Sequence, residues 1–85
     1  MTVELIRETI REHARLPVSL DALPDDASLY EAGMTSHASI GLMLGLEERF
    51  GIEFPDQMLR RSVFESVNSI HMALRQVAGG DEGSM

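Results

Sequence analysis

The chain is 85 residues long, which predicts one domain with a modest core rather than a deep active-site cleft. It contains no cysteine, which excludes disulfides, thiolate metal sites and thiol nucleophiles. The 14 acidic residues outweigh the 7 basic ones, all of them Arg, and the net charge of −7 argues against nucleic acid and for basic protein surfaces as partners.

Membrane insertion and secretion are also not expected. No apolar run approaches the roughly 18 residues that a membrane-spanning helix requires. Residues 1–4 lack the charged and then apolar build of a signal peptide. We therefore expect a cytoplasmic protein that is a monomer by itself.

The first predicted element is a helix over residues 3–16. Thr2 is its predicted N-cap, and Pro17 ends it because a residue before proline avoids the α conformation. Glu residues followed three positions later by Arg predict weak ion pairs on a solvated face. The inner face is predicted from apolar residues at helical spacing: Val3, Ile6, Ile10 and Ala14.

A long connection is predicted over residues 17–35, because this segment is rich in Asp, Pro and Gly. Loops of this length are uncommon in small domains unless they are functional or tied down. The apolar residues expected to tie it to the helices are Leu20, Leu23, Leu29 and Tyr30.

A second helix is predicted from Ser36 to about Phe50, with Gly51 as the residue that ends it. Its buried face is expected to consist of residues that recur at helical spacing: Ser39, Leu42, Met43, Leu46 and Phe50. A short third helix is expected over residues 56–61, after the start signal Pro55-Asp56.

The last helix is predicted from Val67 to about Val77, with Ser66 as its cap. Its inward residues are predicted to be Val67, Ile70 and Leu74. The pair Gly79-Gly80 is expected to end this helix, which divides the chain into a domain over 1–78 and a flexible tail over 79–85. The fold class is therefore all-α.

A serine lies where the long loop meets the second helix, in Gly33-Met34-Thr35-Ser36. The free N–H groups and the positive dipole end of a helix N-terminus favour an anion such as a phosphodiester. The simpler interpretation is that Thr35 or Ser36 only caps the helix, and these residues alone favour it.

The residues around this serine indicate more than a helix cap. The acidic residue, spacer and glycine of Glu31-Ala-Gly-Met-Thr-Ser36 are followed by Leu46-Glu47-Glu48-Arg49-Phe50 and then by Pro55-Asp56. Ala27-Ser28-Leu29 upstream and Phe64-Glu65-Ser66-Val67 downstream extend the pattern. At these distances the sequence resembles the acyl and peptidyl carrier protein family over residues 27–74.

The resemblance implies a four-helix bundle with a short third helix and a long loop between the first two helices. It also implies that Ser36 carries a 4′-phosphopantetheine arm, which a phosphopantetheinyl transferase moves from coenzyme A. The terminal thiol of the arm then holds cargo as a thioester, and partner enzymes do the chemistry. The resemblance thus describes a carrier and not an enzyme, with no catalytic residue.

Two positions depart from the family pattern beside the attachment serine. Thr35 stands where the family usually has Asp, which removes a carboxylate that transferases often recognise. His37 replaces the usual Leu or Ile, at the edge of the surface that faces partners. A hydrolase in which His37 activates Ser36 is disfavoured, because adjacent helix residues point about 100° apart and no orienting acid or oxyanion hole is evident.

The outer side of the second helix is the predicted docking surface, since the family docks partners there. Its predicted contact residues are Ile40, Gly41, Leu44, Glu47 and Glu48. Gly41 and the neighbouring Gly45 have two interpretations, because they either admit a close partner backbone or only loosen the helix.

Other charged residues give weaker signals. Arg60 and Arg61 are unusual for an acidic carrier, and they either pair with acidic neighbours, recognise a partner or phosphate, or are ordinary surface charges. His13 and His71 lack ligand spacing, and the Asp residues of the loop lack the alternation of a calcium site, so we predict no metal.

Within the family the chain looks most similar to small stand-alone aminoacyl carriers, through Thr35-Ser36-His37 and the all-Arg basic set. These carriers are loaded by amino acid:carrier protein ligases that resemble seryl-tRNA synthetases, and a downstream enzyme accepts the aminoacyl group. Two alternatives stay open. One is an acyl carrier for fatty-acid, polyketide or peptide synthesis, and the other is an unmodified acidic helical module that binds a basic partner.

Overall fold

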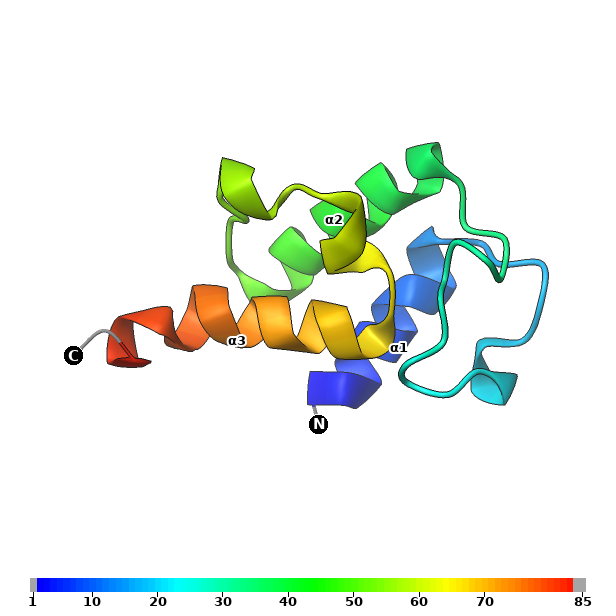
Figure 1. Cartoon of the computed structure of the whole chain (residues 1–85), viewed down its shortest axis with the longest axis horizontal. Coiled ribbons are helices and arrows are strands. Elements are labelled where there is room, and N and C mark those ends of the chain that lie inside the picture. The colour runs from blue at the N-terminus through cyan, green and yellow to red at the C-terminus, as the bar shows by residue number, and fades with distance from the viewer. Residues whose placement is uncertain (1, 84–85) are drawn as a thin grey trace.

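The computed structural model describes the backbone of residues 2–83 and the side chains of residues 3–77. Its three main helices are α1 (Thr2–His13), α2 (Ser36–Phe50) and α3 (Val67–Gly83), as Figure 1 shows. Short 3₁₀ turns lie between them at Leu20–Ala22, Asp56–Met58 and Arg61–Phe64. The all-α prediction is confirmed. Within the described range, no helix is long and apolar enough to cross a membrane.

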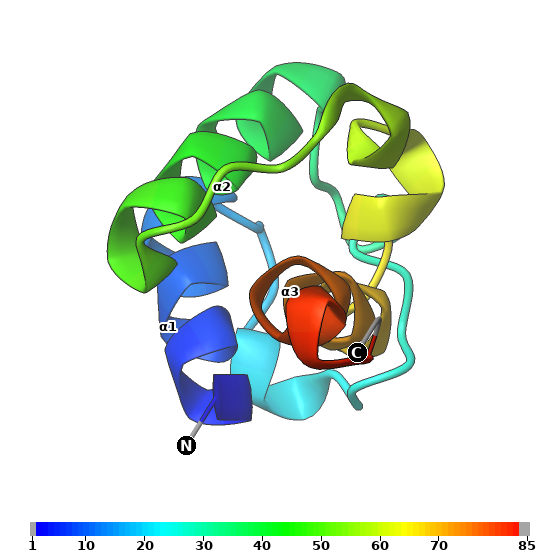
Figure 2. The same ribbon diagram turned by 90° about the vertical axis from the view of Figure 1, so that its left-hand side faces the viewer.

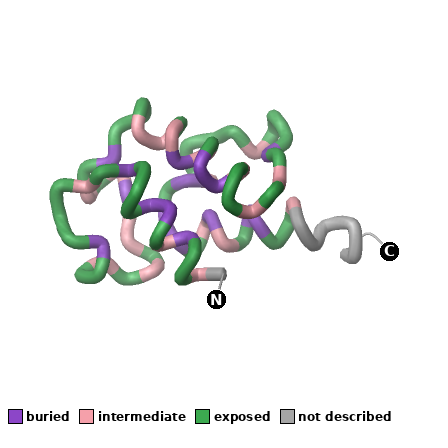
Figure 3. Tube along the Cα trace, turned by 180° about the vertical axis from the view of Figure 1, so that it is seen from behind, coloured by how far each residue is buried: buried purple, intermediate pink, exposed green. Residues whose placement is uncertain are grey.

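The core forms where α1 packs against both α2 and α3, and the turn Arg61–Phe64 closes it by packing on α3. Figure 2 shows α1 and α2 side by side, with α3 seen end-on beside them. Buried residues lie on the inner side of each helix, as the trace in Figure 3 shows. The inner faces predicted for α1 and α3 are confirmed at Ile6, Ile10, Ala14, Val67, Ile70 and Leu74.

Both ends of α2 lie where the sequence predicts them. The Thr35 Oγ1 accepts a hydrogen bond from the Ala38 N–H at 3.0 Å, so Thr35 is the N-cap and Ser36 the first helical residue. At the other end Gly51 adopts the left-handed conformation, with a φ of 64°. On the predicted inner face Leu42 and Leu46 are fully buried, and Ser39, Met43 and Phe50 are partly buried.

Helix α1 spans a different range from the predicted one, because Thr2 is already helical and the helix ends at His13 rather than at residue 16. The Ala14 N–H still donates to the Ile10 carbonyl, but Arg15 adopts a φ of 52°. A residue in this left-handed region cannot continue a right-handed helix. The chain therefore turns away before Pro17 acts.

The predicted short third helix is wrong as a single element. Arg60 lies in an extended conformation between the turns Asp56–Met58 and Arg61–Phe64 and interrupts any helix there. Phe54 and Phe64 are both buried and pack edge to face, with ring centroids 5.4 Å apart. Burial of two aromatic rings from either side of this segment therefore outweighs the local helix signal of Pro55-Asp56.

Helix α3 begins as predicted and ends later than predicted. The Ser69 N–H donates to Ser66 Oγ, and the Ser66 N–H donates to Ser69 Oγ, which is a reciprocal cap. The predicted stop at Gly79-Gly80 is wrong, because the helix continues to Gly83. A glycine in a helix costs only about 1 kcal/mol relative to alanine, so two of them do not force an end. Ser84 and Met85 of the predicted tail lie outside the described residues, and the tail's flexibility stays a prediction.

The long loop is tied to α1 by Arg7, whose side chain is mostly buried. Its guanidinium donates to the Leu20 and Leu23 carbonyls and to Asp25 Oδ1, at distances of 2.6 to 3.1 Å. Leu20 and Leu29 are buried in the core, as predicted, and Leu23 and Tyr30 pack against it. A polar clamp and an apolar anchor together give the loop one conformation.

The acidic residues of α1 have partners beyond those predicted along the helix. Arg49 of α2 donates to Glu8 Oε1 at 2.6 Å and to Glu12 Oε1 at 3.0 Å. This pair of contacts joins α1 to α2 on the surface. The predicted solvated face is confirmed at Glu8 and Glu12, which are both exposed, but their predicted pairing with the Arg three residues on is wrong.

Candidate functional site

Ser36 occupies the first position of α2 and is exposed. Because Thr35 is the cap, the Ser36 hydroxyl has no capping task, and no residue in the described chain hydrogen-bonds to its Oγ. The backbone N–H groups of Ser36 and His37 likewise have no acceptor within the described chain. The site therefore presents a free hydroxyl beside two free N–H donors.

The loop that leads to Ser36 is held tightly against the start of the α1–α2 connection. Gly33 has a φ of 121°, and an added Cβ there would lie 2.5 Å from Pro17 Cδ. Met34 is buried, and its N–H donates to the Leu29 carbonyl at 2.9 Å. The position before the cap is thus fixed by both backbone conformation and packing, which places Ser36 reproducibly at the surface.

The electrostatics at Ser36 favour an anion although the whole chain is acidic. The first turn of α2 contains no acidic residue, and its N-terminal dipole end is positive. Nearby, the Arg61 guanidinium stacks on the Tyr30 ring, with its Cζ 3.9 Å from the ring centroid. The local field therefore suits a negatively charged group attached at Ser36.

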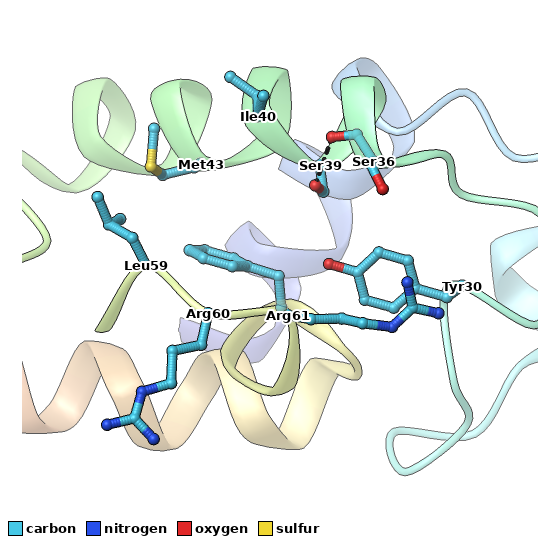
Figure 4. Close-up of a pocket in the computed structure, with 9 residues that line it drawn as sticks. Tyr30, Ser36, Ser39, Ile40, Met43, Leu59, Arg60 and Arg61 are labelled. Atoms are coloured by element: carbon cyan, nitrogen blue, oxygen red, sulfur yellow. Dashed lines mark hydrogen bonds between the residues drawn. The ribbon is translucent and has the colours of Figure 1, made fainter. Parts of the chain in front are cut away.

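Two hollows flank the start of α2. The first has a volume of about 270 Å³ and lies between α2 and the 3₁₀ turns, where Figure 4 shows Ser36 on its rim. Most of its wall is apolar. It is lined by Tyr30, Ser36, Ser39, Ile40, Met43, Leu59, Arg60, Arg61 and Phe64.

The second hollow has a volume of about 570 Å³ and lies between α2 and the end of α1. We name it the α1–α2 groove. Ile40 borders both hollows, so α2 forms the ridge between them. The groove is lined by His13, Ala14, Arg15, Gly33, Thr35, His37, Ala38, Ile40, Gly41 and Leu44.

The predicted docking residues differ in their surroundings. Ile40 and Leu44 are 56% and 54% exposed, which is high for large apolar side chains, and both border the groove. Glu48 is exposed on the same helix. Glu47 is half-buried, and its Oε2 accepts a hydrogen bond from the Phe54 N–H at 2.9 Å. Its carboxylate therefore has a structural task in the fold.

The two glycines of α2 are not equivalent. A Cβ added to Gly41 would meet nothing within 4 Å, so this backbone is open toward the groove. A Cβ added to Gly45 would lie 2.5 Å from two atoms of the His13 ring. Gly45 is thus a packing residue between α1 and α2, whereas Gly41 leaves space at the surface.

The remaining sequence candidates lie apart from one another. His37 is exposed and borders the groove, and no hydrogen bond joins it to Ser36 in the described chain. Among the described side chains, no group of three or more His, Asp or Glu is placed to hold a metal ion. The stacking of Arg61 on Tyr30 could not be predicted from the sequence, because no local pattern links residues so far apart.

The family comparison identifies the kind of protein that contains this exposed serine. The family described as "Phosphopantetheine attachment site" matches residues 4–71. The chain belongs to this family of carrier proteins. As a family member it carries a phosphopantetheine arm and is a carrier rather than a catalyst.

Individual relatives indicate which type of carrier protein this chain resembles. The aminoacyl carrier protein of Agrobacterium fabrum (strain C58) is 43% identical over 79 residues, which are 93% of this chain and 95% of that protein. The Agrobacterium tumefaciens carrier protein has been crystallised with an engineered Bradyrhizobium japonicum glycine:carrier protein ligase and ATP. The matching chain of that complex is 42% identical with a TM-score of 0.88, over 91% of this chain and 100% of the other.

A second crystal structure contains a Bradyrhizobium japonicum glycine:carrier protein ligase complexed with a glycylated carrier protein. The matching chain is 27% identical with a TM-score of 0.63, over 84% of this chain and 90% of the other. The carrier protein described here is therefore an aminoacyl carrier protein by sequence and fold. Its exposed hydroxyl, free N–H donors and acid-free first helical turn fit a phosphodiester-linked arm.

Proposed function

We propose that Ser36 is the attachment residue and that the arm carries a small amino acid, glycine. The single observation that supports Ser36 best is its unengaged, exposed hydroxyl at the N-terminus of α2, with the capping task taken by Thr35. A serine that capped the helix would have to give up that bond when modified. Here modification leaves the helix start intact.

A phosphopantetheinyl transferase supplies the modification. The Ser36 Oγ forms a bond to the phosphorus of the phosphopantetheine group as the pyrophosphate linkage of coenzyme A breaks. Adenosine 3′,5′-bisphosphate is the leaving group, and the hydroxyl proton passes to a base of the transferase. The N–H groups of Ser36 and His37 are then close to the new phosphodiester, where the helix dipole favours its charge. When bound, the arm supplies a terminal thiol that holds the amino acid as a thioester.

Glycine is proposed as cargo because two similar carriers have been crystallised with glycine:carrier protein ligases, one of them in the glycylated state. The complex with ATP supports activation of the amino acid by ATP before its transfer to the thiol. A downstream acceptor enzyme then takes the aminoacyl group. We place this sequence of reactions in the cytoplasm, where ATP and coenzyme A are available.

Intact mass tests the two steps separately. The protein is incubated with coenzyme A and a broad-specificity phosphopantetheinyl transferase, and then with ATP, glycine and a glycine:carrier protein ligase. We expect one phosphopantetheine and then one glycyl group, neither of them on Ser36→Ala. If Ser36→Ala still gains an arm, the attachment residue is not Ser36. An arm that accepts long acyl chains and no amino acid contradicts the glycine proposal.

We further propose that the ligase docks on the α1–α2 groove. Its exposed apolar residues Ile40 and Leu44 follow Ser36 along α2, and the open backbone at Gly41 allows a partner to approach closely. Large exposed apolar side chains that lie next to each other in an otherwise charged domain are typical of an interaction site. The acidic Glu48 at the far end of the ridge suits a basic rim on the partner.

The matched pair Leu44→Glu and Met72→Glu tests this docking surface. Met72 is 63% exposed on α3 and borders neither hollow, so its replacement controls for the added charge. We expect the ligase to load holo Leu44→Glu with a kcat/KM at least about tenfold below that of the Met72→Glu control, the equivalent of about 1.4 kcal/mol. Equal loading of both variants would contradict the groove as the docking site.

A further inference from the structure

Arg61 is held in a defined position beside Ser36. Its guanidinium lies on the Tyr30 ring at 3.9 Å, and both residues line the 270 Å³ hollow that Ser36 borders. Figure 4 shows the Ser36 hydroxyl pointing toward the Tyr30 ring and the Arg61 guanidinium lying against that ring. A stacked guanidinium keeps its edge N–H donors available, because the ring occupies only its face.

The charge of Arg61 is not neutralised within the described chain. Arg7, Arg11 and Arg49 each form an ion pair with a carboxylate at 3.0 Å or less. Arg61 has no such partner among the described residues, although the chain has twice as many acidic as basic residues. The fold thus keeps a preorganised cation near Ser36, the proposed attachment residue.

We propose that Arg61 binds the phosphodiester of the arm on Ser36 and holds the root of the arm on the side of the 270 Å³ hollow. Guanidinium and phosphate form charge-assisted, frequently bidentate hydrogen bonds, and the free N–H groups of Ser36 and His37 contribute donors from the helix side. The inference rests on the proposed attachment at Ser36.

The position of Arg61 gives this contact a functional consequence. The 270 Å³ hollow and the α1–α2 groove lie on opposite sides of the α2 ridge that Ile40 forms. An arm held by Arg61 therefore rests away from the proposed docking groove. A partner that takes up the arm has to break the contact between Arg61 and the phosphodiester.

Phosphorus NMR of the holo protein tests the contact, because it observes the phosphodiester directly and does not depend on cargo loading. The matched control is Arg60→Gln, since Arg60 borders the same hollow but its Nε donates to the Gln57 carbonyl of its own turn. We expect the phosphorus resonance of Arg61→Gln to shift and sharpen toward that of the same phosphodiester in the urea-unfolded holo protein. Arg60→Gln is expected to retain the wild-type resonance.

Three further measurements complete the test. In nitrogen-labelled wild type, the Nε–H signal of Arg61 is expected to shift when the arm is added. Tyr30→Leu, which keeps Arg61 and removes the ring that positions it, is expected to change the phosphorus signal in the same direction as Arg61→Gln. High salt is expected to move the wild-type signal toward that of Arg61→Gln, because an exposed contact is screened. Circular dichroism establishes that each variant is folded.

The outcomes separate this inference from the proposed attachment site. If intact mass shows no arm on Ser36, the attachment proposal and this inference both fail. If the arm is present and the phosphorus signal is the same in wild type and Arg61→Gln, the inference alone is overturned. Equal changes in Arg60→Gln and Arg61→Gln also overturn it, because they indicate a general positive field rather than a contact of Arg61.

Discussion

Adjacent residues at the start of α2 have separate tasks. The Thr35 side chain accepts from the Ala38 N–H, whereas the Ser36 Oγ faces solvent without a partner in the described chain. The family's usual Asp at this position would cap the helix as well as Thr does, since both side chains accept from the same N–H groups. The departure from the family pattern therefore preserves the fold and changes only the charge beside the proposed attachment residue.

This division of tasks predicts different stabilities for two neighbouring substitutions. Thr35→Ala removes the cap and is expected to lower the free energy of unfolding by about 1 kcal/mol. Ser36→Ala removes a hydroxyl without a partner and is expected to change it by less than about 0.5 kcal/mol. Urea unfolding followed by circular dichroism measures both, and an equal loss in the two variants would show that Ser36 shares the capping.

Thr35→Asp provides a matched control at the same position. It keeps a capping oxygen and adds a negative charge at the helix N-terminus. Compared with Thr35→Ala, we expect the restored cap to stabilise the fold and the added charge to contribute about 0.3–1 kcal/mol more. The same urea titration at low salt measures the gain. A gain that persists unchanged in high salt would contradict an electrostatic origin.

At the scale of elements, local signals fixed some boundaries and tertiary contacts fixed the rest. The ends of α2 could be predicted because a Thr-Ser start and a Gly51 end act within one helical turn. The end of α1 and the split of the 56–64 segment could not, since they depend on the left-handed Arg15 and on the packing of Phe54 against Phe64. The burial of Leu46 and the exposure of Leu44 on α2 could also be predicted, because both follow from helical periodicity.

Contacts that join distant residues were beyond sequence reasoning for the same reason. The periodicity of α1 assigns Arg7 to an outer stripe, yet the side chain turns to the loop and bonds two carbonyls there. Glu47 sits in the family's acidic docking pattern, yet its carboxylate binds the Phe54 N–H. Charged side chains are long enough to reach several partners, so spacing alone does not select one.

The clamp formed by Arg7 predicts a large difference between two arginines of α1. Arg7→Met keeps the apolar stem but leaves the Leu20 and Leu23 carbonyls and Asp25 without their donor, which is expected to cost about 2 kcal/mol. Arg11→Met removes one exposed pair with Asp21 and is expected to cost less than about 0.5 kcal/mol. Thermal and urea unfolding measure both, and similar losses would mean that the clamp does not hold the loop.

The glycines of α2 predict a second contrast. Gly41→Ala meets open space and improves helix propensity, so we expect stabilisation of about 0.5–1 kcal/mol. We also expect slower loading by the ligase, because the new methyl group protrudes into the proposed docking groove. Gly45→Ala has the same propensity gain but displaces the His13 ring, so its stability is expected to fall below that of Gly41→Ala.

A double-mutant cycle identifies the cause of the Gly45 effect. In a His13→Ala background the obstruction is gone, and Gly45→Ala is expected to stabilise the fold as Gly41→Ala does. Urea unfolding of the four proteins gives the coupling free energy between positions 13 and 45. A coupling near zero would contradict the packing role of Gly45.

At the scale of the whole molecule, the proposed attachment residue and the C-terminal end of α3 lie apart. In Figure 1 the start of α2 and the C-terminal end of α3 lie at opposite ends of the long axis. The last buried residue of α3 is Leu74, and Val77 packs against the core. The C-terminal turns of α3 therefore lie beyond the part of the helix that closes the core.

This arrangement predicts that a chain of residues 1–78 is a complete carrier domain. It retains every core residue and the whole Ser36 site, so its free energy of unfolding is expected to lie within about 0.5 kcal/mol of the full chain. Its loading with phosphopantetheine is expected to be unchanged. The control is a chain of residues 1–71, which lacks the buried Ala73 and Leu74 and is expected to lose well over 2 kcal/mol, since removal of one core Leu costs about 2–5 kcal/mol. If the 1–78 chain were as unstable as the 1–71 chain, the helical turns up to Gly83 would be part of the fold, and the domain boundary would move to the end of α3.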